Sequence, residues 1–405
     1  MCQQPRRDEL HKFVDAVLKL LAFVLERNEF AFPWQDAREL KGLARETLNL
    51  RPCVSVNRGV PLSSTAAISL FLAIVLSPWF TISAAEFSLS APVLYEGAVD
   101  GSAGADVGDG FFVGATDEPL DGDDELRLYD VKGGPSPKTL QVGVEAAVKS
   151  ALGVQKIKEC DLEGAAKIGD LIFWIGSHGR NKKADEKKER QIFFATKLSG
   201  AGKDAKLEIA GKVYTKLLDD LVNDPALAPF DLAKAATLAP KNEGALNIES
   251  LAADGDKLWI GFRNPKSKAK EALLVPLLNP TQIILEGARA KLGDPVTLKL
   301  GGLGVRDMVT WRDGFLIIAG DFDDRFVQGA KPSRVFSWKP GTDPKDIGVD
   351  FGDLNPEAIV IMGEGDKARI LILSDDGKYP GRANKNVFRG VWLQANAPIG
   401  GGNGN

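Results

Sequence analysis

The stretch "NIESLAADGDKLWIGFRNP", residues Asn247 to Pro265, contains two short apolar runs around a polar turn. Glu249 precedes the first run, and Arg263 and Asn264 follow the second. The Asp-Gly pair at the bend, with apolar residues over strand lengths on both sides, is typical of a β-hairpin. A single hairpin cannot bury an apolar face by itself, so the stretch predicts a hairpin that packs against similar neighbours.

The same unit recurs four more times, in copies that begin at Ser102, Glu163, Arg306 and Glu357. A pair of mostly polar residues closes each copy at a matching distance from its first residue, except that the copy at Glu357 has a longer turn. These closing pairs are Thr116/Asp117, Ser177/His178, Arg263/Asn264, Gly320/Asp321 and Ser374/Asp375. Repeats of roughly 40 to 60 residues with several strands each are typical of propeller blades. We therefore predict an all-β fold, a β-propeller with five detected blades.

One interval between copies, from Glu163 to Glu249, is longer than the others. It contains a segment with helical patterning and several prolines around residues 212–240. We expect an insertion with one or two helices there. A sixth, diverged blade could also lie in this interval, so six blades are allowed.

The stretch "STAAISLFLAIVLSPWFTISAAEF" carries the marks of an export signal. An apolar run, Ala66 to Leu76, is followed by small residues that suit signal peptidase. We predict a signal peptide over residues 61–85, a propeller over 86–394 and a disordered tail over 395–405. This organisation implies a secreted or periplasmic protein.

An N-terminal extension, residues 1–60, precedes that signal. A misassigned start is one explanation, because a chain beginning near Val56 would have a signal of ordinary length. The rival explanation is an uncleaved signal anchor, which would be the route of this protein to a membrane.

Composition excludes some partners. The chain has 405 residues, a formal net charge of −4 and no basic stripe with interleaved aromatic residues, so nucleic acid is not an expected partner. The 43 glycines favour a turn-rich β protein. Beyond the signal, His178 is the one remaining histidine, which excludes histidine-rich metal sites. We expect a monomer.

The repeated polar positions predict a site at one end of the propeller. In a blade the innermost strand begins, and the next strand ends, on the same face of the ring. The first and closing residues of all copies should therefore surround one channel mouth. The candidate ligand-binding residues are Glu163, His178, Arg180, Glu249, Arg263, Asn264, Arg306 and Glu357. A purely structural role, as ion pairs between Glu and Arg, is the alternative.

Acidic residues near the same strand ends are candidate metal ligands. They are Asp117, Asp321, Asp323 and Asp375. Carboxylate oxygens are hard ligands that suit Ca²⁺ better than transition metals. Carboxylates gathered at one mouth repel each other, so either the arginines or a calcium ion must balance them.

Several segments together resemble a known family. They are "SAGADVGDGFFVGATDEP…LRLYD", "IGSHGRN", "LNIESLA…LWIGFRNP…ALLVPLLNP" and "LGGLGVRDM…FLIIAGD". The combination resembles the bacterial domain-of-unknown-function family DUF3616 from about residue 94 to 393, although Ser250 stands where the family pattern usually has Gly. The resemblance implies a propeller and an exported protein, but no reaction. The repeated Glu-Gly-x-Ala is also distantly similar to esterase-like phytase propellers, which are associated with Ca²⁺-dependent hydrolysis of phosphate esters.

Two functions are compatible with these features. The first is an exported propeller that binds an anionic or sugar-like small molecule, or a protein partner, at the channel mouth. The alternative is a Ca²⁺-dependent, phytase-like hydrolase in which Arg180, Arg263 and Arg306 clamp a phosphate ester. Whether the protein is an enzyme stays open at this level.

Overall fold

The computed structural model describes residues 87–116, 126–136, 138–322, 331–376 and 386–395. The predicted N-terminal extension, the predicted signal peptide and residues 396–405 of the predicted tail lie outside these ranges. No helix among the described residues is long and apolar enough to cross a membrane.

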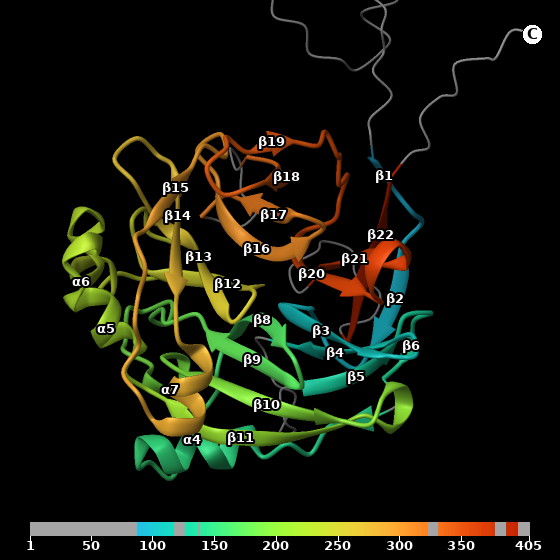
Figure 1. Ribbon diagram of the computed structural model, residues 1–405, viewed down its shortest axis with the longest axis horizontal. Coiled ribbons are helices and arrows are strands. Elements are labelled where there is room, and N and C mark those ends of the chain that lie inside the picture. The colour runs from blue at the N-terminus through green and yellow to red at the C-terminus, as the bar shows by residue number, and fades with distance from the viewer. Residues whose placement is uncertain (1–86, 117–125, 137, 323–330, 377–385, 396–405) are drawn as a thin grey trace, which may run out of the picture. The chain divides into compact units, whose positions relative to one another are not determined.

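The described strands form five sheets arranged as blades around a centre (Figure 1). Blade 1 consists of β3 (Ala103–Gly108), β4 (Phe111–Ala115), β5 (Leu126–Asp130) and β7 (Lys138–Thr139). Blade 2 consists of β8 (Leu162–Ile168), β9 (Leu171–Gly176), β10 (Phe193–Ser199) and β11 (Lys206–Tyr214). Blade 3 consists of β12 (Asn247–Asp254), β13 (Lys257–Lys266), β14 (Ala272–Leu277) and β15 (Val296–Leu298). Blade 4 consists of β16 (Gly304–Trp311), β17 (Gly314–Gly320), β18 (Arg334–Trp338) and β19 (Lys345–Asp346).

Blade 5 combines strands from both ends of the described chain. It contains β20 (Pro356–Met362), β21 (Arg369–Ser374) and β22 (Val387–Ala395), followed by β2 (Val93–Glu96) and β6 (Gly134–Pro135). A short strand, β1 (Phe87–Leu89), also pairs with β22. The fold is therefore the predicted β-propeller, with five blades in the part of the chain that the structure describes.

The first strand of each blade is the innermost one. These inner strands contact each other in ring order: β3 with β8, β8 with β12, β12 with β16, β16 with β20, and β20 with β3. Each pairs with the next strand as the hairpin predicted from the repeats. We call the end of the ring where the inner strands begin the mouth, and the opposite end the far end.

Four of the five inner strands carry a β-bulge near the mouth. In β8 the pairing register shifts between Leu162 and Gly164, which leaves Glu163 as the extra residue. The extra residue in β12 is Glu249, in β16 it is Arg306 and in β20 it is Glu357. A bulge leaves one residue outside the ladder and re-aims its side chain. The first residues of four sequence copies are therefore bulge residues.

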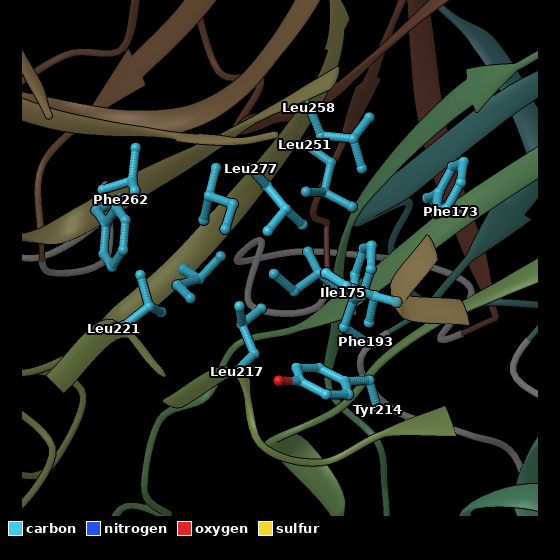
Figure 2. Packing of buried hydrophobic residues seen from close by; sticks show 14 of the residues in the cluster. Phe173, Ile175, Phe193, Tyr214, Leu217, Leu221, Leu251, Leu258, Phe262 and Leu277 are labelled. Carbon is cyan, nitrogen blue, oxygen red and sulfur yellow. The ribbon is translucent and has the colours of Figure 1, made fainter. Parts of the chain in front are cut away.

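Each pair of neighbouring blades encloses a cluster of buried apolar residues. Figure 2 shows the cluster between blades 2 and 3, to which Phe173 and Phe193 of blade 2 and Leu251 and Phe262 of blade 3 belong. Leu217 belongs to the same cluster but comes from the insertion after blade 2. The apolar residues of the insertion thus bury themselves in the wall between two blades.

The predicted helical insertion is confirmed, although β11 continues to Tyr214 and takes the first residues of the expected range. The described residues between β11 and β12 form helices and turns, so no sixth blade is found there. The helical elements of the insertion are α5 (Leu217–Asn223), η3 (Pro225–Phe230) and α6 (Leu232–Ala235). Elsewhere the structure contains α4 (Val144–Leu152), α7 (Pro280–Glu286), η1 (Lys188–Arg190), η2 (Gly202–Asp204) and η4 (Gly365–Lys367).

Candidate functional site

Three of the four bulge residues line a cavity of about 290 Å³ at the mouth of the ring. Glu163, Glu249 and Glu357 contribute to its wall, together with Arg263. Blades 2, 3, 4 and 5 and the loop after the insertion all supply wall residues. Blade 1 supplies none of them, and its corresponding residue, Ser102, precedes a regular stretch of β3 and bonds to Asp100 instead.

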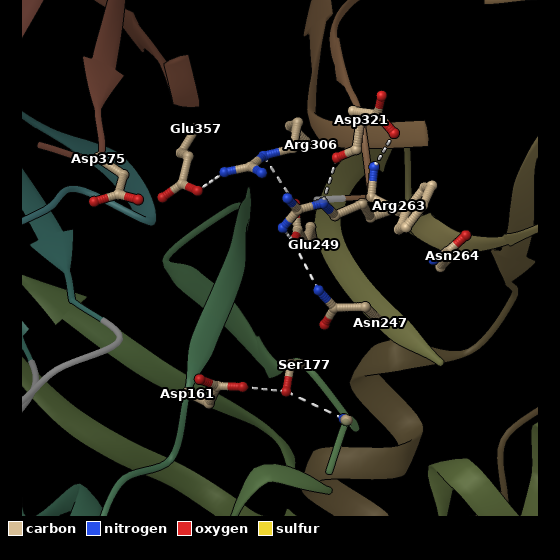
Figure 3. A network of polar contacts seen from close by, with 12 residues as sticks. Asp161, Ser177, Asn247, Glu249, Arg263, Asn264, Arg306, Asp321, Glu357 and Asp375 are labelled. Carbon is tan, nitrogen blue, oxygen red and sulfur yellow. Dashed lines mark hydrogen bonds and ion pairs between the residues drawn. The ribbon is translucent and has the colours of Figure 1, made fainter. Parts of the chain in front are cut away.

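Glu249 is at the centre of a polar network in blade 3 (Figure 3). Its Oε1 accepts hydrogen bonds from Arg263 Nη1 and from Asn247 Nδ2, both at 2.7 Å. Arg263 is itself a bulge residue, because the register of β13 shifts between Phe262 and Asn264. The hairpin therefore opens on Glu and closes on Arg because two bulges direct these side chains toward each other.

Arg306 links three blades at the mouth. Its Nε lies 3.0 Å from Glu249 Oε2, and its Nη2 forms an ion pair with Glu357 (Figure 3). The Nε contact is an ion pair without hydrogen-bond geometry. Burial and the nearby Arg263 lower the pKa of Arg306, while Glu249, Asp375 and Glu163 act in the opposite direction. The side chain is 5% exposed, so this cation depends on the carboxylates around it.

Glu163 differs from the other two glutamates. It lines the cavity but has no hydrogen-bond or ion-pair partner among the described residues. It is only partly exposed, and loss of water raises the pKa of its carboxyl group well above the ordinary value. The charges of Asp161 and Glu249 raise the pKa further, whereas Arg306 and Arg263 lower it. Glu163 is therefore a carboxyl group that holds its proton more tightly than usual.

Asp161 lies two residues before Glu163 and also lines the cavity. Its Oδ2 accepts a hydrogen bond from Ser177 Oγ (Figure 3). The same oxygen accepts a hydrogen bond of 2.8 Å from Arg190 Nη1. Its Oδ1 has no hydrogen-bond partner in the described part of the chain. Burial is the main cause that raises the pKa of Asp161, and Arg190 and Ser177 oppose it. Arg190 also pairs with Glu159.

The structure places His178 and Arg180 away from the cavity wall. His178 is fully buried, with Nδ1 2.8 Å from Gly176 O, and burial lowers its pKa to about 4, so the ring is neutral. The guanidinium group of Arg180 donates to Ala236 O at 2.6 Å and to Ala184 O at 2.9 Å. Arg180 thus holds the insertion against the loop between β9 and β10.

The remaining described candidates have local partners. Asn264 is buried and its Nδ2 donates to Asn242 O at 3.4 Å. The Asp321 carboxylate accepts from its own loop, at Phe322 N and Lys331 N, while its backbone oxygen accepts from Arg263 Nε at 2.7 Å. Asp375 lines the cavity beside Glu357 (Figure 3). Its Oδ2 accepts from Asn355 Nδ2 at 3.2 Å.

Two of the four candidate metal ligands, Asp117 and Asp323, lie outside the described residues. Among the residues that are described, no group of three or more His, Cys, Asp or Glu side chains has an arrangement that could hold a metal ion. The calcium prediction therefore stays a prediction. The described partners of Glu249 and Glu357 are arginines rather than further carboxylates.

Sequence reasoning missed several wall residues, among them Asp161, Arg190 and Phe322. The sequence did contain a signal for Asp161. In four of the five copies a polar residue stands two positions before the first residue of the copy. These residues are Asp100, Asp161, Asn247 and Asn355. Arg190 and Phe322 lie outside the repeat unit, and the repeat pattern held no signal for them.

Inner-strand hairpins in a closed ring and a polar mouth define the protein as a β-propeller, with five blades in the described part of the chain. Residues 201–377 match the model of the family described as "Protein of unknown function (DUF3616)". The match confirms the resemblance to DUF3616 seen in the sequence motifs. No curated protein matches the chain.

Two of the solved structures to which the chain is similar share little sequence identity with it. One is the major allergen Mala s 1 of Malassezia sympodialis, with 9% identity, a TM-score of 0.40, and coverage of 75% of this chain and 97% of the allergen. The other is an α-L-arabinofuranosidase from Podospora anserina, with 9% identity, a TM-score of 0.39, and coverage of 76% of this chain and 96% of that enzyme. Similarity at this level carries no argument about activity.

Proposed function

We propose that the mouth cavity binds a small polyhydroxylated ligand, such as a sugar. The observation that carries this proposal is the Glu163 carboxyl group, which faces the cavity without a partner among the described residues. Its raised pKa extends the pH range over which it is protonated. A protonated carboxyl group both donates and accepts hydrogen bonds, which suits the hydroxyl groups of a sugar.

The charge balance of the wall favours a neutral ligand over an anion. The wall contains six acidic and four basic residues. The guanidinium groups of Arg263 and Arg190 already contact carboxylates, as does that of Arg306 behind the wall. An anionic ligand would have to compete with these carboxylates, whereas a neutral polyol would not.

Phe322 supports the same class of ligand. It is the aromatic residue of the described cavity wall. An aromatic ring offers a rigid apolar surface against which the C–H face of a sugar ring can pack. Carboxyl groups on one side and an aromatic side chain on another give the cavity both polar and apolar contacts, as small-molecule sites usually have.

The test is calorimetric titration of the protein with a panel of neutral monosaccharides and disaccharides. For any sugar that binds, Glu163→Gln should weaken the affinity about tenfold, because one hydrogen bond in a cavity contributes about 1.4 kcal/mol. The matched control is Glu208→Gln, the same chemical change at an exposed position on β11, which should leave the affinity unchanged. If no sugar in the panel binds the unmutated protein, the proposal is wrong.

Calcium-dependent hydrolysis of phosphate esters is the competing function, and the same protein can test it. The arrangement of Arg263 and Arg306 against carboxylates is the reason for ranking it second. Adding Ca²⁺ should leave the melting temperature unchanged if arginines are the counterions of Glu249 and Glu357. A rise in melting temperature with Ca²⁺, together with release of phosphate from phosphomonoesters, would reverse the ranking.

We further propose that the protein is exported and works as a monomer outside the cytoplasm. This rests on the apolar run and the small residues before Glu86. N-terminal sequencing of the protein from culture supernatant or periplasm should find a start near residue 86. A membrane-bound form that retains Met1 would contradict cleavage, and light scattering would test the monomer.

A further inference from the structure

The strongest additional feature of the mouth is the pair formed by Asp161 and Glu163. Both side chains line the same cavity, and they lie two residues apart where the chain enters β8. Asp161 is 7% exposed and contributes to the cavity wall. The two carboxyl groups act on each other, because the charge of Asp161 raises the pKa of Glu163.

The environments of the two groups are unequal. Asp161 has Arg190 and Ser177 on one oxygen, and both contacts stabilise the ionised form. Glu163 has no such contact within the described residues and lies beside two carboxylates, those of Asp161 and Glu249. Burial raises the pKa of both groups, but only Asp161 has a cation and a hydroxyl group on its carboxylate, so a single proton shared by the pair favours Glu163 over Asp161. Oδ1 of Asp161 has no hydrogen-bond partner among the described residues.

We infer that Asp161 and Glu163 form an acid–base dyad that hydrolyses the glycosidic bond of an O-glycoside bound in the mouth cavity. The inference rests on the proposed function, since it requires that a sugar occupies this cavity. Two carboxyl groups in opposite protonation states are the usual acid and base for this reaction class.

Hydrolysis of the glycosidic bond needs only the bound glycoside, water and the two carboxyl groups. Glu163 donates its proton to the glycosidic oxygen as the bond from that oxygen to the anomeric carbon breaks. Asp161 Oδ1 accepts a proton from the water molecule whose oxygen bonds to the anomeric carbon. The products are a free sugar and an alcohol, and the proton then passes from Asp161 back to Glu163.

Other charged groups around Glu163 fit these roles. Glu249 is paired with Arg263 and Arg306, so it does not supply the proton and can stabilise positive charge that develops on the sugar ring. The same two arginines act on Glu163 and limit the rise of its pKa. Turnover should therefore fall as the pH rises through the pKa of Glu163, because the acid is then lost.

The experiment uses 4-nitrophenyl and 2,4-dinitrophenyl glycosides of the sugars that bind in the calorimetric panel. The unmutated protein should release nitrophenol. Glu163→Gln should slow the hydrolysis of 4-nitrophenyl glycosides at least 100-fold, as expected for a lost general acid. The loss should be much smaller with 2,4-dinitrophenyl glycosides, because this better leaving group needs little protonation. A merely structural role would slow both substrates equally.

The outcomes separate this inference from the proposed function. Sugars that bind but whose glycosides are never hydrolysed would overturn the dyad and leave the binding proposal intact. Absence of any binding would overturn both. Turnover that is unchanged in Glu163→Gln would assign the activity elsewhere and overturn the dyad. Glu208→Gln is the control for both substrates, and Asp161→Asn should lose activity with either leaving group.

Discussion

The two ends of the same inner strands differ in character. At the mouth, four strands carry a bulge, and the extra residues are Glu163, Glu249, Arg306 and Glu357. At the far end those strands pair regularly and surround a cavity of about 410 Å³ whose wall contains many small residues. Examples are Ala105, Ala165, Ala166, Ala252 and Ala253.

This difference shows how one inserted residue per strand can create a site. Regular pairing keeps the period of two, so side chains at the far end follow the ordinary alternation of a strand. A bulge interrupts that alternation and brings one further side chain toward the centre. In β3 the described register shift lies near the far end, between Asp106 and Gly108, and blade 1 is also the blade without a charged anchor.

The largest effect is expected when the charge balance of the mouth is broken. Arg306→Ala should lower the free energy of unfolding by about 4 kcal/mol, because it removes the cation that pairs with half-buried Glu357 and with one oxygen of buried Glu249. The far-end control is Thr310→Ala on the same strand, which removes a hydrogen bond to Ala253 O and should cost about 1 kcal/mol. Urea denaturation measures both, and equal losses would mean that the ends do not differ energetically.

A second comparison uses two glycines of β8 and its turn. A Cβ at Gly164, next to the bulge, would lie 2.7 Å from Leu251 N and 2.9 Å from Ser250 C, which are backbone atoms of β12. Gly164→Ala should therefore cost about 3 kcal/mol. Gly169, in the far-end turn, has open space but a φ of +63°, so Gly169→Ala should cost about 1 kcal/mol. Thermal unfolding that ranks the two in the reverse order would contradict the close approach at the mouth.

A third prediction concerns the carboxylate behind the mouth, Asp307. It accepts hydrogen bonds from Ile359 N at 2.6 Å and Met308 N at 2.7 Å, and a longer one from Ser250 Oγ at 3.4 Å. Asp307→Asn should cost about 2 kcal/mol, because an amide N–H would face a backbone N–H. Ser250→Ala should cost less, since its bond is long. Chemical denaturation of both variants provides the comparison.

The smallest effect is a pH dependence that only the mouth should show. The pKa of Glu163 is raised in the folded protein, so its contribution to stability is complete below the unfolded pKa of about 4.3 and is lost as the pH rises through the folded pKa. Glu163→Gln should therefore match the unmutated protein near pH 4 and become the more stable of the two at higher pH. Melting curves of the two proteins across this range test the sign.

Much of the architecture could be predicted from the sequence. The hairpins at Ser102, Glu163, Glu249, Arg306 and Glu357 are confirmed, as are the helical insertion and the longer turn of the last copy, which contains η4. These features depend on local patterns of apolar residues and turn residues, which the sequence displays directly.

The bulges could not be predicted in the same way. Whether Glu163 pairs with β9 or stands outside the ladder is decided by the neighbouring blade, which approaches the backbone at Gly164. The partners of Asp161 depend likewise on Arg190, which comes from a loop between β9 and β10. Such contacts come from a neighbouring blade or from a loop outside the repeat unit and not from local propensity, so the repeat pattern located the anchors but not their partners.

Blade 5 is the last blade that can fold, because it combines strands from both ends of the described chain. Trp392 N donates to Ser90 Oγ across 302 residues of sequence, and β2 lies between β22 and β6. During synthesis β2 must wait without its main partner until β22 has emerged, while blades 1 to 4 have all of their strands already. Contacts this distant in sequence slow folding. A circular permutant that moves β2 to a position directly after β22 should therefore fold faster, because the ring would then be built from five contiguous hairpins and their outer strands.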